Sequence, residues 1–110
     1  MSSHAPQPVE KLLSPWQDAL VAWVKGDRPD LTNRQMALLL IVCLEPGQHT
    51  VRGLAARLGV AKPVISRVID KLCGLGYVMR KTDMRDRRNI FVLPTADGSA
   101  FLDDFAESLH

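Results

Sequence analysis

The sequence is poor in the motifs that support catalysis or metal binding. Its three histidines, His4, His49 and His110, are spread along the chain, and none has an evident Ser or Cys partner. There is no phosphate-cradling glycine loop, no HExxH motif and no pair of carboxylates in an apolar context. We therefore predict that the protein is not an enzyme and uses neither a cofactor nor a metal.

Long apolar runs are also absent. No stretch approaches the roughly 18 apolar residues of a membrane span. The first ten residues, MSSHAPQPVE, lack the charged and apolar regions of a signal peptide. The sequence thus predicts no membrane partner and, by default, a cytoplasmic location.

Cysteine is scarce, with only Cys43 and Cys73 present. Both lie inside predicted helices, without the short paired spacing of a zinc site, and two are too few for a disulfide framework. We interpret both as reduced core residues. The alternative is redox sensing, which requires an accessible and activated thiol.

Charge is unevenly distributed, although the net charge is only +2. Residues 61–91 contain eight Lys or Arg and three Asp, a net of +5, so the rest of the chain carries −3. A basic region on an otherwise acidic chain is typical of a nucleic-acid-binding module.

Residues 49–93 contain two helical patterns separated by a tight turn. Thr50 is placed to cap the first helix, and Gly59 stands where a helix needs a left-handed residue after its end. Pro63 lies near the start of the second helix, predicted over 62–73, where its missing N–H is harmless. The inward positions are Leu54, Ala55 and Leu58, followed by Val64, Ile65, Val68, Ile69 and Leu72. This arrangement predicts a helix-turn-helix.

A basic β-hairpin, residues 77–93, is predicted directly after it. Residues 77–81 and 89–93 favour strands, and the loop between them contains three arginines but no Gly or Pro. A loop built only to turn would favour Asn-Gly or Asp-Gly. A long cationic loop is typical of an element that reaches phosphates or a minor groove.

The helix-turn-helix followed by the D-x-R-D-R-R hairpin resembles the MarR family of winged-helix transcriptional regulators, over roughly residues 31–105. The resemblance implies a mainly α fold with a small β-hairpin wing and about five helices. We expect a disordered arm at 1–10 and a single winged helix-turn-helix domain at 11–110. Its parts would be an N-terminal helix and loop (11–30), a DNA-binding core (31–93) and a C-terminal helix (94–110).

The flanking helices are predicted from their caps. Ser14, Pro15 and Gln17 look like a capping box that opens a helix ending at Gly26, and Thr32 with Gln35 looks like a second box. Thr95 is placed to cap the last helix. Trp16, Leu20, Trp23 and Val24 share one face, which suggests core packing or an oligomer contact, with an aromatic ligand platform as the alternative.

Base contacts are expected near the start of the second motif helix, which enters the major groove in this motif. Arg67 is the best candidate for a bidentate contact with guanine, and Pro63 for a thymine methyl. The N-terminus of the first motif helix would face phosphate through its free N–H groups. The predicted DNA contacts in these two helices are Thr50, Arg52, Lys62, Pro63, Ser66, Arg67 and Lys71.

The family resemblance implies roles in the wing. Arg85 would enter the minor groove from the loop tip, and Asp83 and Arg87 match a pair that holds the loop in shape. Arg87, Arg88 and Lys81 would also contact DNA, the last two as phosphate contacts. A solvated, ion-paired loop in which Asp86 offsets one arginine is the alternative.

Two functions remain open from the sequence. One is a homodimeric, sequence-specific regulator that binds double-stranded DNA, with Trp16, Trp23, Phe101 and Phe105 as candidate dimer contacts. The other is a winged-helix protein-interaction module without specific DNA binding. The cationic wing favours the first. Relatives are usually longer and often bind small aromatic acids or phenols, but the sequence assigns no effector here.

Overall fold

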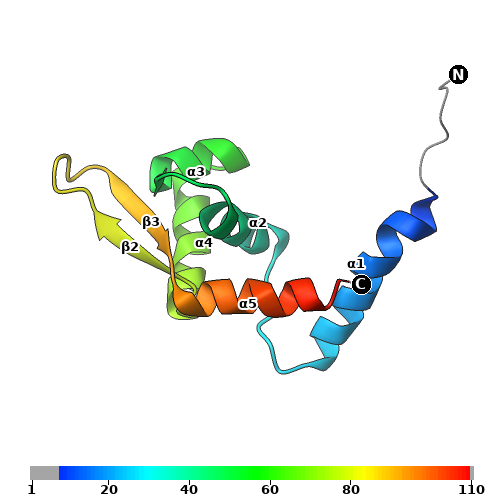
Figure 1. Ribbon diagram of the computed structural model, residues 1–110. Coiled ribbons are helices and arrows are strands. Elements are labelled where there is room, and N and C mark those ends of the chain that lie inside the picture. The colour runs from blue at the N-terminus through cyan, green and yellow to red at the C-terminus, as the bar shows by residue number, and fades with distance from the viewer. Residues whose placement is uncertain (1–7, 110) are drawn as a thin grey trace, which may run out of the picture. The chain divides into compact units, whose positions relative to one another are not determined.

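A computed structural model describes residues 8–109, which form five helices and three short strands (Figure 1). In chain order these are α1 (Val9–Lys25), α2 (Asn33–Leu44), β1 (His49–Thr50), α3 (Val51–Leu58), α4 (Lys62–Gly74), β2 (Val78–Thr82), β3 (Ile90–Pro94) and α5 (Ala96–Glu107). The predicted mainly α fold with a hairpin wing is confirmed. Among these residues, no helix has the length and apolar character needed to cross a membrane.

The chain divides into two compact units, which are described separately. One spans Leu31–Leu102 and contains α2, α3, α4, the sheet and the first part of α5. The other contains α1, the loop that follows it and the chain from Asp103 onward. Helix α5 contributes residues to both units.

The core of the Leu31–Leu102 unit lies between its helices and the sheet. Helix α2 packs against α3, α4 and β3. The largest side chains with almost no exposure are Leu38, Leu39, Ile65, Ile69, Leu72 and Val92. Full burial of each such side chain contributes roughly 1.5–3 kcal/mol, so these residues hold α4 and the wing on one scaffold.

Local caps fix the limits of these helices as predicted. Thr32 Oγ1 accepts a hydrogen bond from the Gln35 amide at 3.2 Å, and the Gln35 side chain accepts one from the Thr32 amide at 2.9 Å. Thr50 caps α3 by accepting from the Gly53 amide at 2.9 Å. Gly59 ends α3 with a φ of 66°, a left-handed conformation that other residues adopt at a cost.

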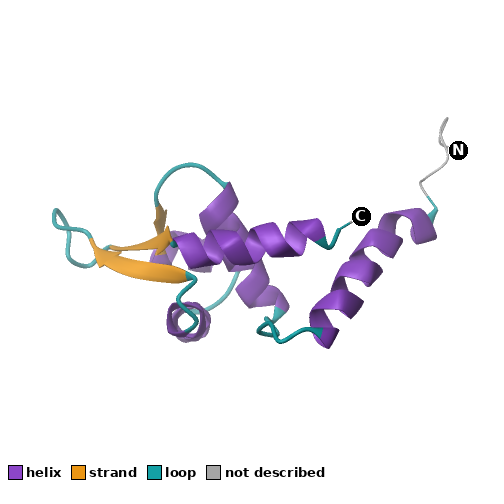
Figure 2. Cartoon of the chain, turned by 60° about the horizontal axis from the view of Figure 1, so that its bottom comes forward, coloured by secondary structure: helices purple, strands orange, loops and turns teal. Residues whose placement is uncertain are grey.

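The sheet has the order β1-β3-β2, with both pairs antiparallel, and the β2–β3 hairpin projects beyond the helices of its unit (Figure 2). Both hairpin strands begin and end one residue later than predicted. The Tyr77 amide closes the end of α4 by donating to the Leu72 carbonyl at 2.9 Å, which delays β2 to Val78. Pro94, one residue beyond the predicted second strand, pairs with Val78 as the last residue of β3.

The start of α5 is tied to the turn that follows α4. Thr95 Oγ1 donates to the Gly76 carbonyl at 2.6 Å and accepts from the Gly98 amide at 3.0 Å, which confirms Thr95 as the cap. A side chain at Gly98 would collide with the Tyr77 carbonyl oxygen, so only glycine permits this close approach.

The end of α5 is earlier than predicted. Its last amides make short-range turns, Ser108 to the Phe105 carbonyl at 3.0 Å and Leu109 to the Ala106 carbonyl at 3.1 Å. The helix therefore ends at Glu107 rather than running to His110, which lies outside the described residues.

Helix α1 corrects two predictions about the N-terminus. The expected arm over 1–10 falls mostly on residues 1–7, outside the described part, but Val9 and Glu10 are already helical. The capping box at Ser14 is therefore wrong, and Pro15 lies inside the helix. The Pro8 carbonyl accepts from the Lys11 and Leu12 amides and opens the helix earlier. The helical spacing of apolar residues also extends back through Leu12 to Val9. This spacing indicates a helix before Pro15, although the proline had suggested a helix start at that point.

The aromatic residues of this unit differ in their burial. Trp23 and Phe105 are buried, with ring centroids 5.3 Å apart, and Arg28 lies 4.4 Å above the Trp23 ring. Trp16 also meets Phe105 edge-on, at 5.9 Å, but stays 43% exposed. The predicted face is therefore part core and part surface, and Val24 is 77% exposed.

Several apolar residues of α1 are exposed and share one side of the helix. We call this set the α1 stripe: Val9, Leu12, Leu13, Trp16 and Leu20, each 40–64% exposed. Four of them, together with Val21, line a groove of about 620 Å³.

Candidate nucleic-acid interface

Helix α4 has a buried and an exposed side, as its spacing predicted. Ile65, Val68, Ile69 and Leu72 are buried. Lys62, Pro63, Arg67 and Lys71 are exposed, and Ser66 is half-buried between the two sides. Ala61 is the N-cap, so the helix begins at Lys62 and Pro63 takes its second position. The predicted contact residues of α4 thus share a solvent-facing surface.

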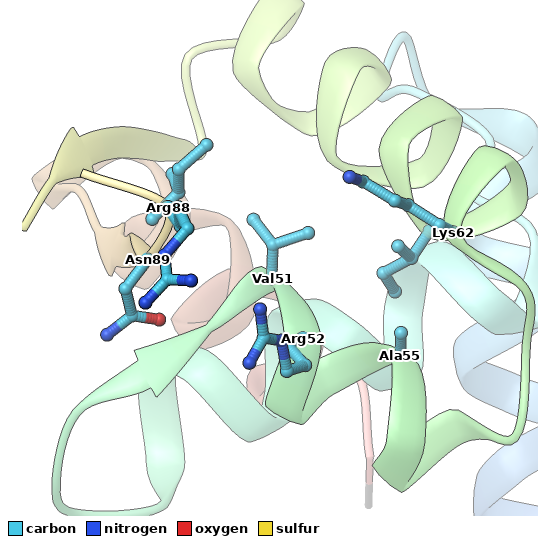
Figure 3. A pocket seen from close by; sticks show the side chains of 8 residues that line it. Val51, Arg52, Ala55, Lys62, Arg88 and Asn89 are labelled. Atoms are coloured by element: carbon cyan, nitrogen blue, oxygen red, sulfur yellow. The ribbon is translucent and has the colours of Figure 1, made fainter. Parts of the chain in front are cut away.

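A pocket of about 300 Å³ lies where α3, α4 and the base of the wing meet (Figure 3). Its cationic side chains come from three different elements: Arg52 from α3, Lys62 from α4 and Arg88 from the end of the wing loop. Val51, Ala55, Ile65 and Ile90 provide apolar walls, and Asn89 completes the lining. We call this the cationic pocket. Three positive groups around one cavity suit an anionic group such as a phosphate.

The pairing of β1 with β3 explains this convergence. Thr50, the N-cap of α3, lies opposite Phe91 in the sheet. The base of the wing is therefore held beside the first turn of α3, although the two are some forty residues apart in sequence. All three cations were predicted DNA contacts, but their convergence in one pocket depends on the pairing of the strands.

The wing loop is held by Asp83, through partners that sequence analysis did not name. One carboxylate oxygen of Asp83 accepts from the Arg85 amide at 2.9 Å, and the other accepts from the Asn89 side-chain amide at 3.3 Å. The Asp83 amide also donates to the Asn89 carbonyl at 2.9 Å. Among the described residues, no hydrogen bond or ion pair joins Asp83 to Arg87, so the expected pairing of these two residues is not seen.

Asp86 pairs with Arg88, which corresponds to the ion-paired alternative for one arginine. Arg88 Nε donates to Asp86 Oδ1 at 3.1 Å, and its backbone amide donates to the same oxygen at 3.1 Å. These hydrogen bonds from Arg88, with a smaller contribution from the charge of Arg52, hold the pKa of Asp86 below its usual range. Arg88 remains 85% exposed in the pair, so its charge faces solvent.

Arg80 lies in the basic region but was not selected from the sequence. Its Nη2 donates to Asp70 Oδ1 at 2.6 Å, which joins β2 to α4. No sequence signal identified this pair, because the two residues are ten apart and belong to different elements. Across residues 8–109, six predicted contact cations of α4 and the wing have neither a hydrogen bond nor an ion pair from their side chains: Lys62, Arg67, Lys71, Lys81, Arg85 and Arg87.

Both cysteines are half-buried, and neither forms a disulfide. Burial raises the pKa of the Cys43 thiol, against a smaller opposing effect of its hydrogen bond with Ser99. Cys73 Sγ accepts from Arg80 Nη1 at 3.6 Å. Within the described part of the chain, no group of three or more His, Cys, Asp or Glu residues is placed to hold a metal ion.

Comparison with known proteins identifies relatives of this arrangement. A sequence model described as "MarR family" matches residues 30–89. The solved structure of the transcriptional regulator Tm0710 from Thermotoga maritima is 25% identical, with a TM-score of 0.71, over 94% of this chain and 73% of that one. The crystal structure of MarR is 26% identical, with a TM-score of 0.69, over 92% and 74% of the two chains.

A MarR-family transcriptional regulator from Rhodococcus sp. RHA1 is also similar, at 26% identity and a TM-score of 0.67 over 94% of this chain and 77% of that one. No match was found among curated proteins.

Proposed function

The chain belongs to the MarR family of transcriptional regulators, and on that premise we propose that it binds double-stranded DNA sequence-specifically. Helix α4 would enter the major groove and the wing would reach the minor groove. The observation that carries this proposal is the cationic pocket, where α3, α4 and the wing each direct a positive side chain to one cavity.

Base recognition is assigned to the first half of α4. Arg67 is exposed and makes no ion pair in the described structure, so its guanidinium is available for the O6 and N7 atoms of guanine. Pro63 offers an apolar contact for a thymine methyl, and Ser66 contacts a base or a phosphate. Lys71, two turns beyond Pro63 on the same helix, contacts the backbone.

Phosphate contacts are assigned around this helix. Arg52, Lys62 and Arg88 hold one phosphate in the cationic pocket, and the capped N-terminus of α3 at Thr50 faces the same strand. Lys81 and Arg87 neutralise further phosphates along the wing. Arg85 projects from the loop tip into the minor groove, supported by the Asp83 hydrogen bonds that shape the loop.

The active species is proposed to be a homodimer, as is typical of this family. Two copies would place two α4 helices on half-sites of a pseudo-palindrome, about 10 bp apart or a multiple of that. Of the candidate dimer contacts, Trp23, Phe101 and Phe105 are buried within the chain, which leaves Trp16 as the exposed one. Trp16 belongs to the α1 stripe, so we assign the contact to that stripe. The proposal includes no effector.

Selection from a pool of random-sequence duplexes tests this function. The protein is titrated at two salt concentrations, about 50 and 200 mM, and its oligomeric state is measured in the same buffers. We expect enrichment of a pseudo-palindrome and a steep fall in affinity with salt. Weak and unselective binding by a monomer would reject the proposal in favour of a protein-interaction module.

A further inference from the structure

Arg80 extends from the wing strand β2 and reaches α4 at three points. Its Nη2 donates to Asp70 Oδ1 at 2.6 Å and lies 3.5 Å from the Ser66 carbonyl oxygen. Its Nη1 donates to Cys73 Sγ at 3.6 Å. The three contacted residues are separated by four and three positions, so they form a single line along α4. One guanidinium therefore spans two turns of the recognition helix.

The place of β2 in the sheet makes this contact important. β2 is an edge strand, since the order is β1-β3-β2, and its partner β3 lies on one side only. Within the Leu31–Leu102 unit, β2 also packs against α4. Arg80 provides the polar connection across that boundary. The next residue, Lys81, makes no ion pair or side-chain hydrogen bond in the described structure, and its side chain points to the other face of the strand.

We propose that Arg80 and Asp70 form a positioning clamp that fixes the angle between the recognition helix and the wing while both contact DNA. The clamp rests on the proposed function. Arg80 is then a positioning residue and makes no phosphate contact, although it lies in the most basic part of the chain.

The exposure of the pair argues against a simple role in stability. Arg80 and Asp70 are 34% and 66% exposed, and exposed ion pairs contribute little to folding. DNA, in contrast, engages α4 in one groove and the wing in the next, so an error in their mutual angle removes contacts in both. Asp70, four residues after Ser66, places a carboxylate on a surface that would bind DNA, which is a polyanion. The clamp gives a reason for a negative charge at this position.

Asp70→Ala gives a test in which the two explanations have opposite signs. If Asp70 only repels phosphate, its removal tightens binding. If it forms the clamp, its removal weakens binding, on the order of tenfold. Asp103→Ala is the matched control, because it removes the same charge from an exposed position on α5 outside the proposed surface. We expect Asp103→Ala to leave affinity nearly unchanged.

The double variant Asp70→Ala/Arg80→Ala keeps the net charge of the wild type. We expect it to bind as weakly as the single variants, with no additional loss. The exchanged pair, Asp70→Arg/Arg80→Asp, should recover part of the affinity. Wild-type affinity in the double variant would show that only the charge balance matters and would overturn the clamp. Circular dichroism verifies that each variant is folded. A variant that does not fold is replaced by Arg80→Lys, which keeps the positive charge but lacks the forked guanidinium.

Two further readouts separate positioning from other roles. Lys81→Ala should reduce the slope of log affinity against log salt by about one. Arg80→Ala and Asp70→Ala remove opposite charges but should change this slope in the same direction, because each displaces the phosphate contacts of the wing. In addition, Arg85→Ala should cost less in the Asp70→Ala/Arg80→Ala background than in the wild type, because the wing is already misplaced. An unchanged cost would indicate general destabilisation and overturn the clamp.

Failure of the clamp is distinguishable from failure of the proposed function. If wild-type protein selects no duplex, the proposed function fails and the role of the clamp in DNA binding fails with it. If wild-type protein binds its site and Asp70→Ala binds equally well or better, only the clamp is overturned.

Discussion

Two exposed surfaces of this protein differ in their chemistry: the surface of α4 and the wing, and the α1 stripe. The first presents six cations without ion pairs in the described structure, together with the cationic pocket. The second presents Val9, Leu12, Leu13, Trp16 and Leu20. They belong to different compact units of the chain.

The comparison shows that exposure carries different information for charged and apolar groups. An exposed arginine is fully hydrated and costs nothing, so a cationic surface becomes informative only when several elements direct charge to one place, as in the cationic pocket. Burial of an exposed apolar stripe would contribute about 25 cal/mol of stabilisation for each Å² removed from water. Contiguous apolar surface of this kind marks a site of protein contact. We therefore expect the first surface to bind DNA and the second to bind another copy of the chain.

The largest expected effect follows from charging the α1 stripe. Leu13 is 54% exposed on α1, and Leu13→Glu would place a carboxylate in the proposed dimer contact. We expect a monomer and a loss of about a hundredfold or more in affinity for the full pseudo-palindrome, because the second half-site no longer adds avidity. Light scattering and titration against the full site and a half-site measure both quantities.

Leu44→Glu is the control for this experiment, since Leu44 is a 68% exposed leucine at the end of α2 in the other unit. It should remain dimeric. A dimeric Leu13→Glu protein would place the contact elsewhere and remove the basis of the comparison.

A smaller effect is expected from Arg67→Ala. Loss of a bidentate contact with guanine should cost about 1–3 kcal/mol and relax the preference at one base position. Affinity for a panel of single-base variants of the selected site provides the measurement. Lys25→Ala, which removes one positive charge from α1, is the control for net charge. An equal loss on every sequence would make Arg67 a phosphate contact instead.

A weaker and sequence-dependent effect is expected from Arg85→Ala. The variant should lose roughly tenfold, or about 1.4 kcal/mol, on sites with narrow A·T-rich minor grooves, because their negative potential attracts an inserted arginine. The loss on G·C-rich sites should be smaller. Met84→Ala changes the neighbouring exposed side chain of the loop without changing charge and serves as the control. Equal losses on both kinds of site would exclude the minor-groove role.

The smallest effect is expected for an arginine of the Leu31–Leu102 unit that already forms an ion pair within the chain. Arg57 makes two hydrogen bonds to the Glu45 carboxylate, at 2.9 and 2.8 Å, and these lower the pKa of Glu45. Since the folded-state pKa is depressed, this contribution to stability is present above the ordinary pKa of Glu45 and is lost as the pH falls through the lowered value. We therefore expect Glu45→Gln to lower the melting temperature slightly near neutral pH but not in acid.

Thermal unfolding of wild type and Glu45→Gln, at about pH 7 and about pH 3, measures this difference. DNA affinity and its salt dependence should be unchanged, since Arg57 is excluded from the proposed contacts. A steeper salt slope in the variant would show that the released Arg57 contacts phosphate, which would extend the DNA-binding surface to this pair and weaken the distinction between paired and unpaired arginines.

The sequence by itself determined the features that depend on neighbouring residues. The caps at Thr32, Thr50 and Thr95 act over three residues, and Gly59 acts at its own position, so their roles follow from short patterns. The buried side of α4 follows from the helical period in the same way. The concentration of positive charge in residues 61–91 is likewise a property of the sequence.

Only the tertiary structure decided which side chains meet across elements. Arg80 reaches Asp70 because β2 lies along α4, and the three cations of the pocket converge because β1 pairs with β3. The period of α1 places Trp16 and Trp23 on nearly the same side, yet one is 43% exposed and the other 6%. Spacing along a chain specifies a direction from a helix axis, whereas burial and ion pairing depend on what another element brings into that direction.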